Sequence, residues 1–292
     1  MRKSPLISIV IPTLNSHDVI HASIESIALQ SFRSIEVILS DGGSSDQTVS
    51  YAMARLQKAA IDVSVIISPG SSIYHAINLA VSIARGEWLY VLGSDDRLYD
   101  TDVLRVVAQL LSWTSADVVY GDAWFERSSG FLYGGVFWLN RFNSLNICHQ
   151  SLFYRASAVR NLGISYDENY KILADWDYNL RLFARLRFEY ISLPIARYAC
   201  YGISDSRKDD VFLNDLQGKI IDYFGVRAFW LLTPDWLSIA VAQRSNMMTK
   251  VLLAVNRLAY IIGRKLIGSK FGQRAASSRD LYVSPLIVGR NP

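Results

Sequence analysis

The stretch Glu87-Trp88-Leu89-Tyr90-Val91-Leu92-Gly93-Ser94-Asp95-Asp96 decides how the rest of the chain is interpreted. Its apolar run ends in a Gly-Ser turn, which is the pattern of a buried strand. Asp95 and Asp96 then follow at the carboxyl end of that strand, where ligands of open α/β sheets bind. Adjacent carboxylates repel each other unless a cation, a proton or hydrogen bonds compensate them. Helix capping is the better explanation of one such Asp, whereas for two at a strand end a hard divalent cation becomes a competitive explanation.

Length and composition indicate a folded protein with a large core. The chain has 292 residues, of which 51% are hydrophobic and 19% are charged. This length fits one large domain, or one domain with an appendage. Cys148 and Cys200 lack metal-like spacing and suit a reducing compartment. The apolar run Leu6–Ile11 is too short and too β-branched for a signal peptide, so no export is expected.

Upstream and downstream of the opening stretch, strands alternate with helices. The expected strands are Leu6–Ile11, Ile35–Ser40, Asp62–Ile67 and Glu87–Leu92. The expected helices between them are one that Asn15 or Ser16 caps, then Gln47–Ala59 and Ile73–Ala84. This alternation predicts an α/β fold with a mostly parallel, twisted sheet flanked by helices.

The pattern changes after Leu111. Short extended segments predict a small antiparallel extension, and they are Asp117–Tyr120, Ala123–Arg127 and Phe131–Phe137. A helix is expected over Trp176–Leu186, with Asp177 and Arg181 spaced for an i,i+4 ion pair, and Phe188–Leu193 and Arg197–Tyr201 again look extended. We expect a main domain over residues 1–205 and a helical C-terminal appendage over 206–292.

Several nucleotide-binding and catalytic motifs are absent from the sequence. The turn Pro12-Thr13-Leu14-Asn15 lacks the G-x-G-x-x-G phosphate turn, and no G-x-x-x-x-G-K-[ST] loop occurs. No G-x-S-x-G elbow or His/Cys cluster is found either. Carboxylate-rich turns after the second and fourth strands remain as the candidate site.

Several sequence blocks, taken in order, carry a resemblance. The blocks are Ile7–Asn15, Ile35–Thr48, Ile73–Asn78, Ala84–Glu87, Gly93–Asp96, His149–Phe153, Ala174–Arg181 and Gly202–Ser204. Together they resemble family 2 glycosyltransferases of the GT-A fold, most closely bacterial members that build cell-surface polysaccharides. The resemblance covers roughly residues 5–205, and its specificity comes from the order of the blocks.

The resemblance implies inverting transfer of a sugar from a nucleotide diphosphate donor, with UDP-sugar expected from family habit. The sugar would be a hexosyl or N-acetylhexosaminyl group, and the acceptor a hydroxyl of a glycan or lipid-linked molecule. The residues that would bind the donor are Pro12, Thr13, Asn15, Asp41, Gly42, Asn78, Arg85, Ser94 and Asp95. Asp95 and Asp96 match the metal position, where Mn²⁺ or Mg²⁺ would bridge the diphosphate. Helix capping is the alternative role of Asn15 and Asp46.

Asp175 matches the family's general base, which takes the proton of the acceptor hydroxyl. Because Asp175 stands where a helix begins, capping is its alternative role. The possible acceptor or donor pocket comprises His149, Gln150, Trp176 and Asp177, with burial in the core as the alternative. The usual first acid of the D-x-D turn is Gly93 in this chain. The competing hypothesis is therefore a non-catalytic nucleotide-sugar-binding or scaffold protein of the same fold.

The C-terminal region concentrates positive charge. Eight of the 30 Lys and Arg residues lie between Trp236 and Arg279, where no Asp or Glu occurs. Lys250, Arg257 and Arg264 recur every seven residues among apolar ones, as in a helix lying in the membrane surface. A helix packed on the protein is the alternative. We expect a cytoplasmic enzyme, peripheral on the inner face of the plasma membrane, that does not bind nucleic acid.

Overall fold

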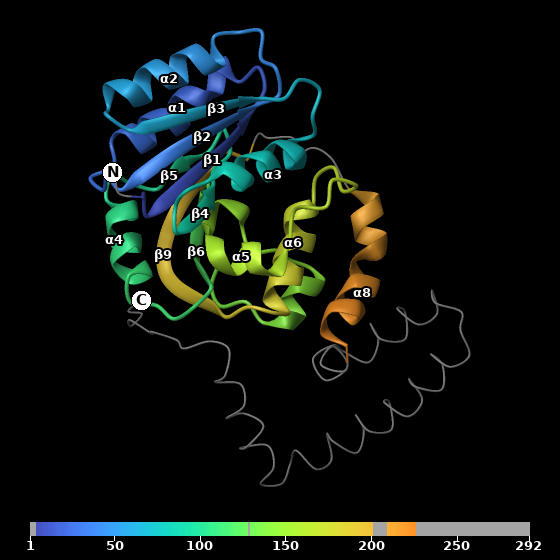
Figure 1. The fold of residues 1–292 in the computed structure, drawn as a ribbon. Helices are drawn as coiled ribbons and strands as arrows, with labels where there is room; N and C mark the ends of the chain where they lie inside the picture. Colours follow the sequence, from blue (N-terminus) through green and yellow to red (C-terminus); the bar gives the residue numbers. More distant parts are fainter. Residues whose placement is uncertain (1–3, 128, 201–208, 226–292) are drawn as a thin grey trace, which may run out of the picture.

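The computed structural model describes residues 4–127, 129–200 and 209–225. A twisted sheet runs through the molecule with helices on both faces (Figure 1). One face is covered by α1 (His17–Ala28), α2 (Thr48–Lys58) and α4 (Val103–Leu111), and their apolar residues form one core cluster. The other face is covered by α3 (Ile73–Ile83), α5 (Ala156–Leu162), α6 (Ala174–Phe183) and α8 (Asp210–Phe224). The predicted α/β class is confirmed.

The sheet follows the order β3-β2-β1-β4-β8-β6-β9-β5, with β7 paired to β6. Its strands are β1 (Ile7–Thr13), β2 (Ile35–Asp41), β3 (Asp62–Ile67), β4 (Trp88–Val91), β5 (Arg97–Leu98), β6 (Val118–Phe125), β7 (Phe131–Tyr133), β8 (Leu152–Arg155) and β9 (Phe188–Tyr198). Pairing is parallel from β3 through β4, and β8 lies antiparallel between β4 and β6.

The apolar runs of β1 and β4 arise because both faces of these strands are covered. Ile7, Ile9 and Ile11 pack into the cluster under α1, α2 and α4, whereas Val10 packs into the cluster on the opposite face. Every residue of β1 is buried, so the strand needs apolar side chains on both faces. The parallel register sets Thr13 beside Asp41 at one edge of the sheet.

The second half of the chain departs from the sequence prediction. The two segments predicted within 117–127 fall on one strand, β6, and those predicted from 188 onward fall on another, β9, which ends at Tyr198; Tyr201 lies outside the described residues. These two strands pair in parallel, with register shifts between Tyr120 and Ala123. The shifts interrupt the alternation that marks a strand, which is why each was predicted as two. Of the predicted antiparallel extension, 131–133 form β7, which pairs antiparallel with β6, whereas β8, also antiparallel to β6, was not predicted.

Helix α8 shares its core with α6. Phe212, Leu216, Ile220 and Phe224 belong to the cluster that also holds Leu180. The predicted domain boundary at residue 205 and the predicted membrane helix beyond residue 226 lie outside the described residues. Within the described part of the chain, no helix is both long and apolar enough to cross a membrane.

Candidate functional site

The loops after β1 and β2 are joined at the carboxyl edge of the sheet. The Gly42 N–H donates to the Thr13 carbonyl at 2.8 Å. Asn15 adopts a positive φ of 47° and its side-chain oxygen accepts from the Ser45 N–H at 3.0 Å. The Thr13 hydroxyl is buried and has no partner within the described chain. Two loops are thus held in fixed register, with one unpaired hydroxyl between the strand ends.

Asp41 is turned into its own loop. Its carboxylate accepts from the Gly43 N–H at 2.9 Å, the Ser44 N–H at 2.7 Å and the Ser44 hydroxyl at 2.5 Å. The side chain is 1% exposed. Three of its roughly four acceptor sites therefore shape the turn, which leaves one, on Oδ1, for a nucleobase N–H. Asp46 accepts from His17 N–H and Thr48 N–H, so the expected capping role of this residue is present.

Asp96 at the end of β4 points into the protein. Its two oxygens accept from the Ala199 N–H at 2.9 Å and from the Gln150 side-chain amide at 2.6 Å. Burial, with the neighbouring Asp95 charge, raises the pKa of Asp96 to about 7. A Cβ added at Gly93 would lie 2.5 Å from an Asp96 oxygen. The glycine thus provides the space in which Asp96 sits.

Asp95 is the carboxylate of this turn that remains available. It is half-buried, and its side chain makes no hydrogen bond or ion pair with the described residues. No group of three or more His, Cys, Asp or Glu side chains that could hold a metal lies in the described ranges. Mg²⁺ is commonly held by one or two carboxylates together with substrate phosphates, so Asp95 fits as the one protein ligand. Ser94 next to it contacts the Ser16 hydroxyl at 3.2 Å.

A cavity of about 380 Å³ opens beside this turn. It is bounded by β-strand ends on one side and by α3 and α6 on the other. Its lining includes Pro12, Ile73, Tyr74, Ile77, Val91, Gly93, Phe125, Tyr133, Ser144, Leu145, Asn146, Ile147, Cys148, His149, Gln150, Ile172, Leu173, Asp175, Trp176 and Tyr198. The volume lies near the lower end of the range of roughly 300–1,000 Å³ for small-molecule sites.

Asp175 is the carboxylate that lines the cavity. Its side chain accepts from the Asn146 amide at 2.8 Å, and the Tyr74 hydroxyl, which donates to the Ile172 carbonyl, lies 3.4 Å from its other oxygen. Burial raises the pKa of Asp175 to about 6. The group is therefore mainly ionised near neutral pH and can accept a proton from a hydroxyl in the cavity.

Three more predicted pocket residues line the same cavity. His149 contacts the Tyr166 hydroxyl through Nε2 at 2.9 Å, and burial lowers its pKa to about 4, so the ring is neutral. Gln150 holds Asp96, and the Trp176 ring N–H donates to the Phe142 carbonyl at 3.1 Å. These bonds fix each side chain at the cavity wall.

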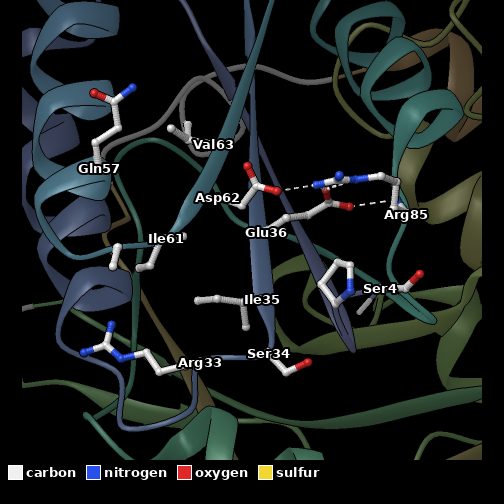
Figure 2. Close-up of a pocket in the computed structure, with 12 residues that line it drawn as sticks. Ser4, Arg33, Ser34, Ile35, Glu36, Gln57, Ile61, Asp62, Val63 and Arg85 are labelled. Atoms are coloured by element: carbon white, nitrogen blue, oxygen red, sulfur yellow. Dashed lines mark hydrogen bonds and ion pairs between the residues drawn. The ribbon is translucent and has the colours of Figure 1, made fainter. Parts of the chain in front are cut away.

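The structure places Arg85 away from this site. The Arg85 guanidinium binds Glu36 and Asp62, with contacts of 2.5 Å and 2.6 Å, at the amino ends of β2 and β3 (Figure 2). Figure 2 also shows the open cleft beside this ion pair. The prediction that Arg85 binds the donor does not fit this placement, because Thr13, Asp41 and Gly42 lie at the opposite, carboxyl edge of the sheet.

Asn78 and Asp177 also face other parts of the protein. The Asn78 side chain bonds both backbone groups of Tyr166, at 3.0 and 2.9 Å, and so joins α3 to the loop before α6. Asp177 is 1% exposed and forms the predicted i,i+4 pair with Arg181 at 2.7 Å. It also accepts from the Tyr223 hydroxyl on α8 at 2.7 Å. Asp177 therefore anchors α8 instead of lining the pocket.

Sequence reasoning missed the two partners of Asp175. Asn146 lies in an irregular segment, and no motif marks it. Tyr74 is in the recognised block at the start of α3, but its reach to Asp175 depends on how α3 and α6 pack. The role of Gln150 as the partner of Asp96 was likewise visible only in three dimensions.

Comparison with known proteins now adds to this geometry. The family model described as glycosyl transferase family 2 matches residues 8–160. A PGL/p-HBAD biosynthesis glycosyltransferase of Mycobacterium bovis is 36% identical over 254 residues, spanning 85% of this chain and 97% of that protein. Glycosyltransferase GlyG of Streptococcus pneumoniae is 27% identical over 190 residues, which are 64% of this chain and 57% of that protein.

Solved structures show a similar fold at low sequence identity. The S. aureus TarS 1-349 complex with UDP-GlcNAc has a TM-score of 0.61 and 17% identity, and covers 91% of both chains. Mannosyltransferase PcManGT from Pyrobaculum calidifontis, in complex with GDP-Man and Mn²⁺, has a TM-score of 0.54 and 16% identity, and covers 96% of this chain and 85% of that one. The expected GT-A architecture is thereby confirmed. With its family model, its relatives and its fold in agreement, the chain belongs to glycosyl transferase family 2.

Proposed function

We propose that this glycosyltransferase inverts the anomeric centre of a UDP-sugar and transfers a hexosyl or N-acetylhexosaminyl group to a hydroxyl acceptor. The acceptor would be a glycan or lipid-linked molecule used in cell-surface polysaccharide synthesis. The observation that carries the proposal is Asp175, a half-buried carboxylate that lines a cavity reaching Gly93 and Pro12 at the strand ends. The residue proposed as the base and the strand ends proposed to bind the donor thus line one cavity.

Asp175 would act as the base. Its carboxylate takes the proton as the acceptor oxygen attacks the anomeric carbon, and the nucleoside diphosphate leaves on the opposite face. The Asn146 amide at 2.8 Å orients the carboxylate and leaves lone pairs for the acceptor hydroxyl. A pKa of about 6 keeps Asp175 ionised at neutral pH while preserving useful basicity.

Asp95 would hold the divalent cation, Mn²⁺ or Mg²⁺, whose positive charge offsets the negative charge of the diphosphate. The carboxylate of Asp95, which has no partner among the described residues, supports this role, whereas Asp96 is occupied by Gln150 and Ala199 and supports the turn. The choice of UDP is supported by a structural neighbour, S. aureus TarS, that is in complex with UDP-GlcNAc. A second neighbour is in complex with GDP-Man and Mn²⁺, so the donor panel should include GDP-sugars.

We further propose that the enzyme works at the inner face of the plasma membrane. The support is the sequence of residues 250–267, which sets Lys250, Arg257 and Arg264 among apolar residues. Sedimentation with anionic phospholipid vesicles tests this, with neutral vesicles as the control. Binding to anionic vesicles that high salt abolishes is expected, and absence of binding would contradict the proposal.

The main experiment pairs calorimetry with turnover. UDP should bind the wild-type protein more tightly with Mn²⁺ than without it, and Asp95→Asn should remove most of this difference. A panel of UDP- and GDP-sugars should then reveal one donor that is consumed. Metal-dependent binding with no turnover of any donor would favour the non-catalytic sugar-nucleotide-binding alternative. Equal binding with and without metal would contradict the role of Asp95.

A further inference from the structure

One buried carboxylate outside the cavity joins two helices of the site. Asp209 is the N-cap residue of α8, where its Oδ1 accepts from the Phe212 N–H at 3.3 Å. Its Oδ2 accepts from the N–H groups of Ile172 and Leu173, at 2.9 Å and 3.2 Å. Although burial acts against the charged form, these backbone donors lower the pKa of Asp209. The carboxylate is therefore ionised at neutral pH and binds both elements at once.

The two N–H groups on Oδ2 belong to the segment that leads into the proposed base. Leu173 is the N-cap residue of α6, and its carbonyl accepts from the N–H groups of Trp176 and Asp177. Asp175 is the second residue of that helix. The backbone position of Leu173 therefore determines where α6 begins and from which direction the Asp175 side chain enters the cavity. Ile172 and Leu173 themselves line the cavity.

The backbone of Ile172 is held on both sides. Its N–H donates to Asp209, while its carbonyl accepts from the Tyr74 hydroxyl on α3. Asn146 donates to one oxygen of Asp175 at 2.8 Å, and the Tyr74 hydroxyl lies 3.4 Å from the other. Asn146 thus orients the carboxylate of the base, whereas Tyr74 and Asp209 hold the backbone that precedes it.

Side-chain packing brings the start of α6 against the first two turns of α8. The Tyr170 hydroxyl donates to Asp215 at 2.9 Å, and the Tyr170 ring lies 5.2 Å from the Phe212 ring. The Trp176 ring lies 5.6 Å from the same phenyl ring. These contacts bring the two helices together through side chains. Asp209 differs from them because it binds the backbone of the segment directly.

The position of this backbone matters for proton transfer. A general base acts only when its carboxylate is within hydrogen-bond reach of the hydroxyl that it deprotonates. A displacement of about 1 Å, caused by a change far from the reacting atoms, can lower a rate about a hundredfold. Without Asp209, two N–H groups beside the cavity would lose their acceptor, and the segment would have to move to find another.

We propose that Asp209 is a positioning residue for the transfer reaction: by binding the N–H groups of Ile172 and Leu173, its carboxylate fixes the direction from which Asp175 enters the cavity. The inference rests on the proposed function, because it takes Asp175 as the base. It adds a residue that does not line the cavity and lies outside the sequence blocks that carry the family resemblance. It also makes α8 a part of the catalytic unit.

Asp209→Ser in the full chain separates the two roles of this carboxylate. Serine caps a helix about as well as aspartate, so α8 keeps its first bond, but its single oxygen cannot also hold the segment before α6. Turnover at saturating concentrations of the donor that the panel identifies should fall about ten- to a hundredfold. The dissociation constant for UDP with Mn²⁺ should stay within about twofold of wild type. Unchanged turnover would overturn the proposal.

Asp210→Ser is the matched control. Asp210 is the exposed neighbour of Asp209 in the first turn of α8, and its side chain makes no bond with the described residues. The substitution removes the same charge from the same helix end, so turnover should stay within about twofold of wild type. An equal loss of turnover in both variants would overturn the proposal, because it would assign the effect to charge alone.

A double variant shows whether Asp209 acts through the base. When Asp209→Ser is added to Asp175→Asn, the residual turnover should fall by less than about twofold, because the group that Asp209 positions is already absent. A residual turnover that falls by the full factor seen in the single variant would overturn the proposal. Asp209 would then act on the reaction independently of Asp175.

Amide hydrogen exchange tests the same contact without turnover. In Asp209→Ser the N–H groups of Ile172 and Leu173 should exchange at least about tenfold faster than in wild type, because each loses a bond to a charged acceptor. Unchanged exchange at both groups, in a chain that turns over a donor, would overturn this inference alone. Faster exchange in the variant, with no turnover of any donor by the wild-type protein, would count against the proposed function alone.

Discussion

Replacing Gly93 tests how the turn after β4 is built. The resemblance to related enzymes would treat Gly93 as a lost acid, so Gly93→Asp would be expected to strengthen metal binding. The structure leads to the opposite expectation. A Cβ at this position would lie 2.5 Å from an Asp96 oxygen and 3.0 Å from an Asp95 oxygen. Any side chain here must displace Asp96.

The size of the effect follows from what Asp96 would lose. Displacement breaks its bonds with the Ala199 N–H and the Gln150 amide, at 2.9 and 2.6 Å, in a site where the residue is 1% exposed. Hydrogen bonds to a charged group contribute roughly 1.5–3 kcal/mol each, and partial relaxation recovers some of this. We expect Gly93→Ala to lower the free energy of unfolding by about 2–4 kcal/mol.

Urea unfolding at pH 7 without nucleotide measures this difference. Gly42→Ala is the matched control, because a Cβ there would meet only the Leu14 side chain, at 3.4 Å, and should cost less than about 1 kcal/mol. Mn²⁺ titration in the presence of UDP then compares Gly93→Asp with wild type. The reasoning is refuted if Gly93→Ala is as stable as wild type, or if Gly93→Asp binds Mn²⁺ more tightly.

Four further predictions concern other contacts. Arg85→Ala should lower the free energy of unfolding by about 1–3 kcal/mol, because Glu36 stays buried without its cation. The KM for the donor should not change. Urea unfolding and donor kinetics measure the two quantities, and a raised KM would indicate that Arg85 does bind the donor. Asp177→Ala should cost about 3 kcal/mol in urea unfolding, because two cations on α6 and α8 lose their buried partner, and an unaffected midpoint would contradict that anchor. The initial rate of transfer should fall about tenfold per pH unit below pH 6 as Asp175 becomes protonated, and a flat profile between pH 5 and 7 would contradict its role as base. Burial raises the pKa of Asp96 to about 7 in the folded protein, so its ionisation opposes folding. The contribution of Asp96 to stability therefore decreases as the pH rises from about 4 to 7. Over that range the free energy of unfolding of Asp96→Asn should fall less than that of wild type.

The N-terminal half of the fold was predictable because each element there carries its own signal. Strands such as β1 are covered on both faces and read as unbroken apolar runs closed by turns. In β6 and β9 the signal fails locally. Gly121 lies at the register shift, where a Cβ would meet the Leu193 carbonyl of the partner strand, so its lack of a side chain reflects close packing instead of a turn. Such packing has no one-dimensional pattern.

The site was predictable in position but not in side-chain direction. The ends of β1, β2 and β4 meet because parallel strands share an edge, which brings Thr13, Asp41 and Gly93 together. Which way a carboxylate points depends on partners elsewhere in the chain. For Asp177 the sequence did carry a signal, because Asp175 and Asp177 are two residues apart and residues with that spacing on a helix do not share a face. Asp175 and Asp177 could therefore not both have pointed into one pocket.

The most direct test of the central claim is Asp175→Asn. The substitution keeps an acceptor oxygen for Asn146 and nearly the same shape, but it removes the group that takes the proton. With the donor identified from the sugar-nucleotide panel, we predict that transfer falls by at least about a hundredfold while the dissociation constant for UDP with Mn²⁺ stays within about twofold of wild type. Retention of transfer at a rate close to that of wild type would contradict the assignment of Asp175 as the base.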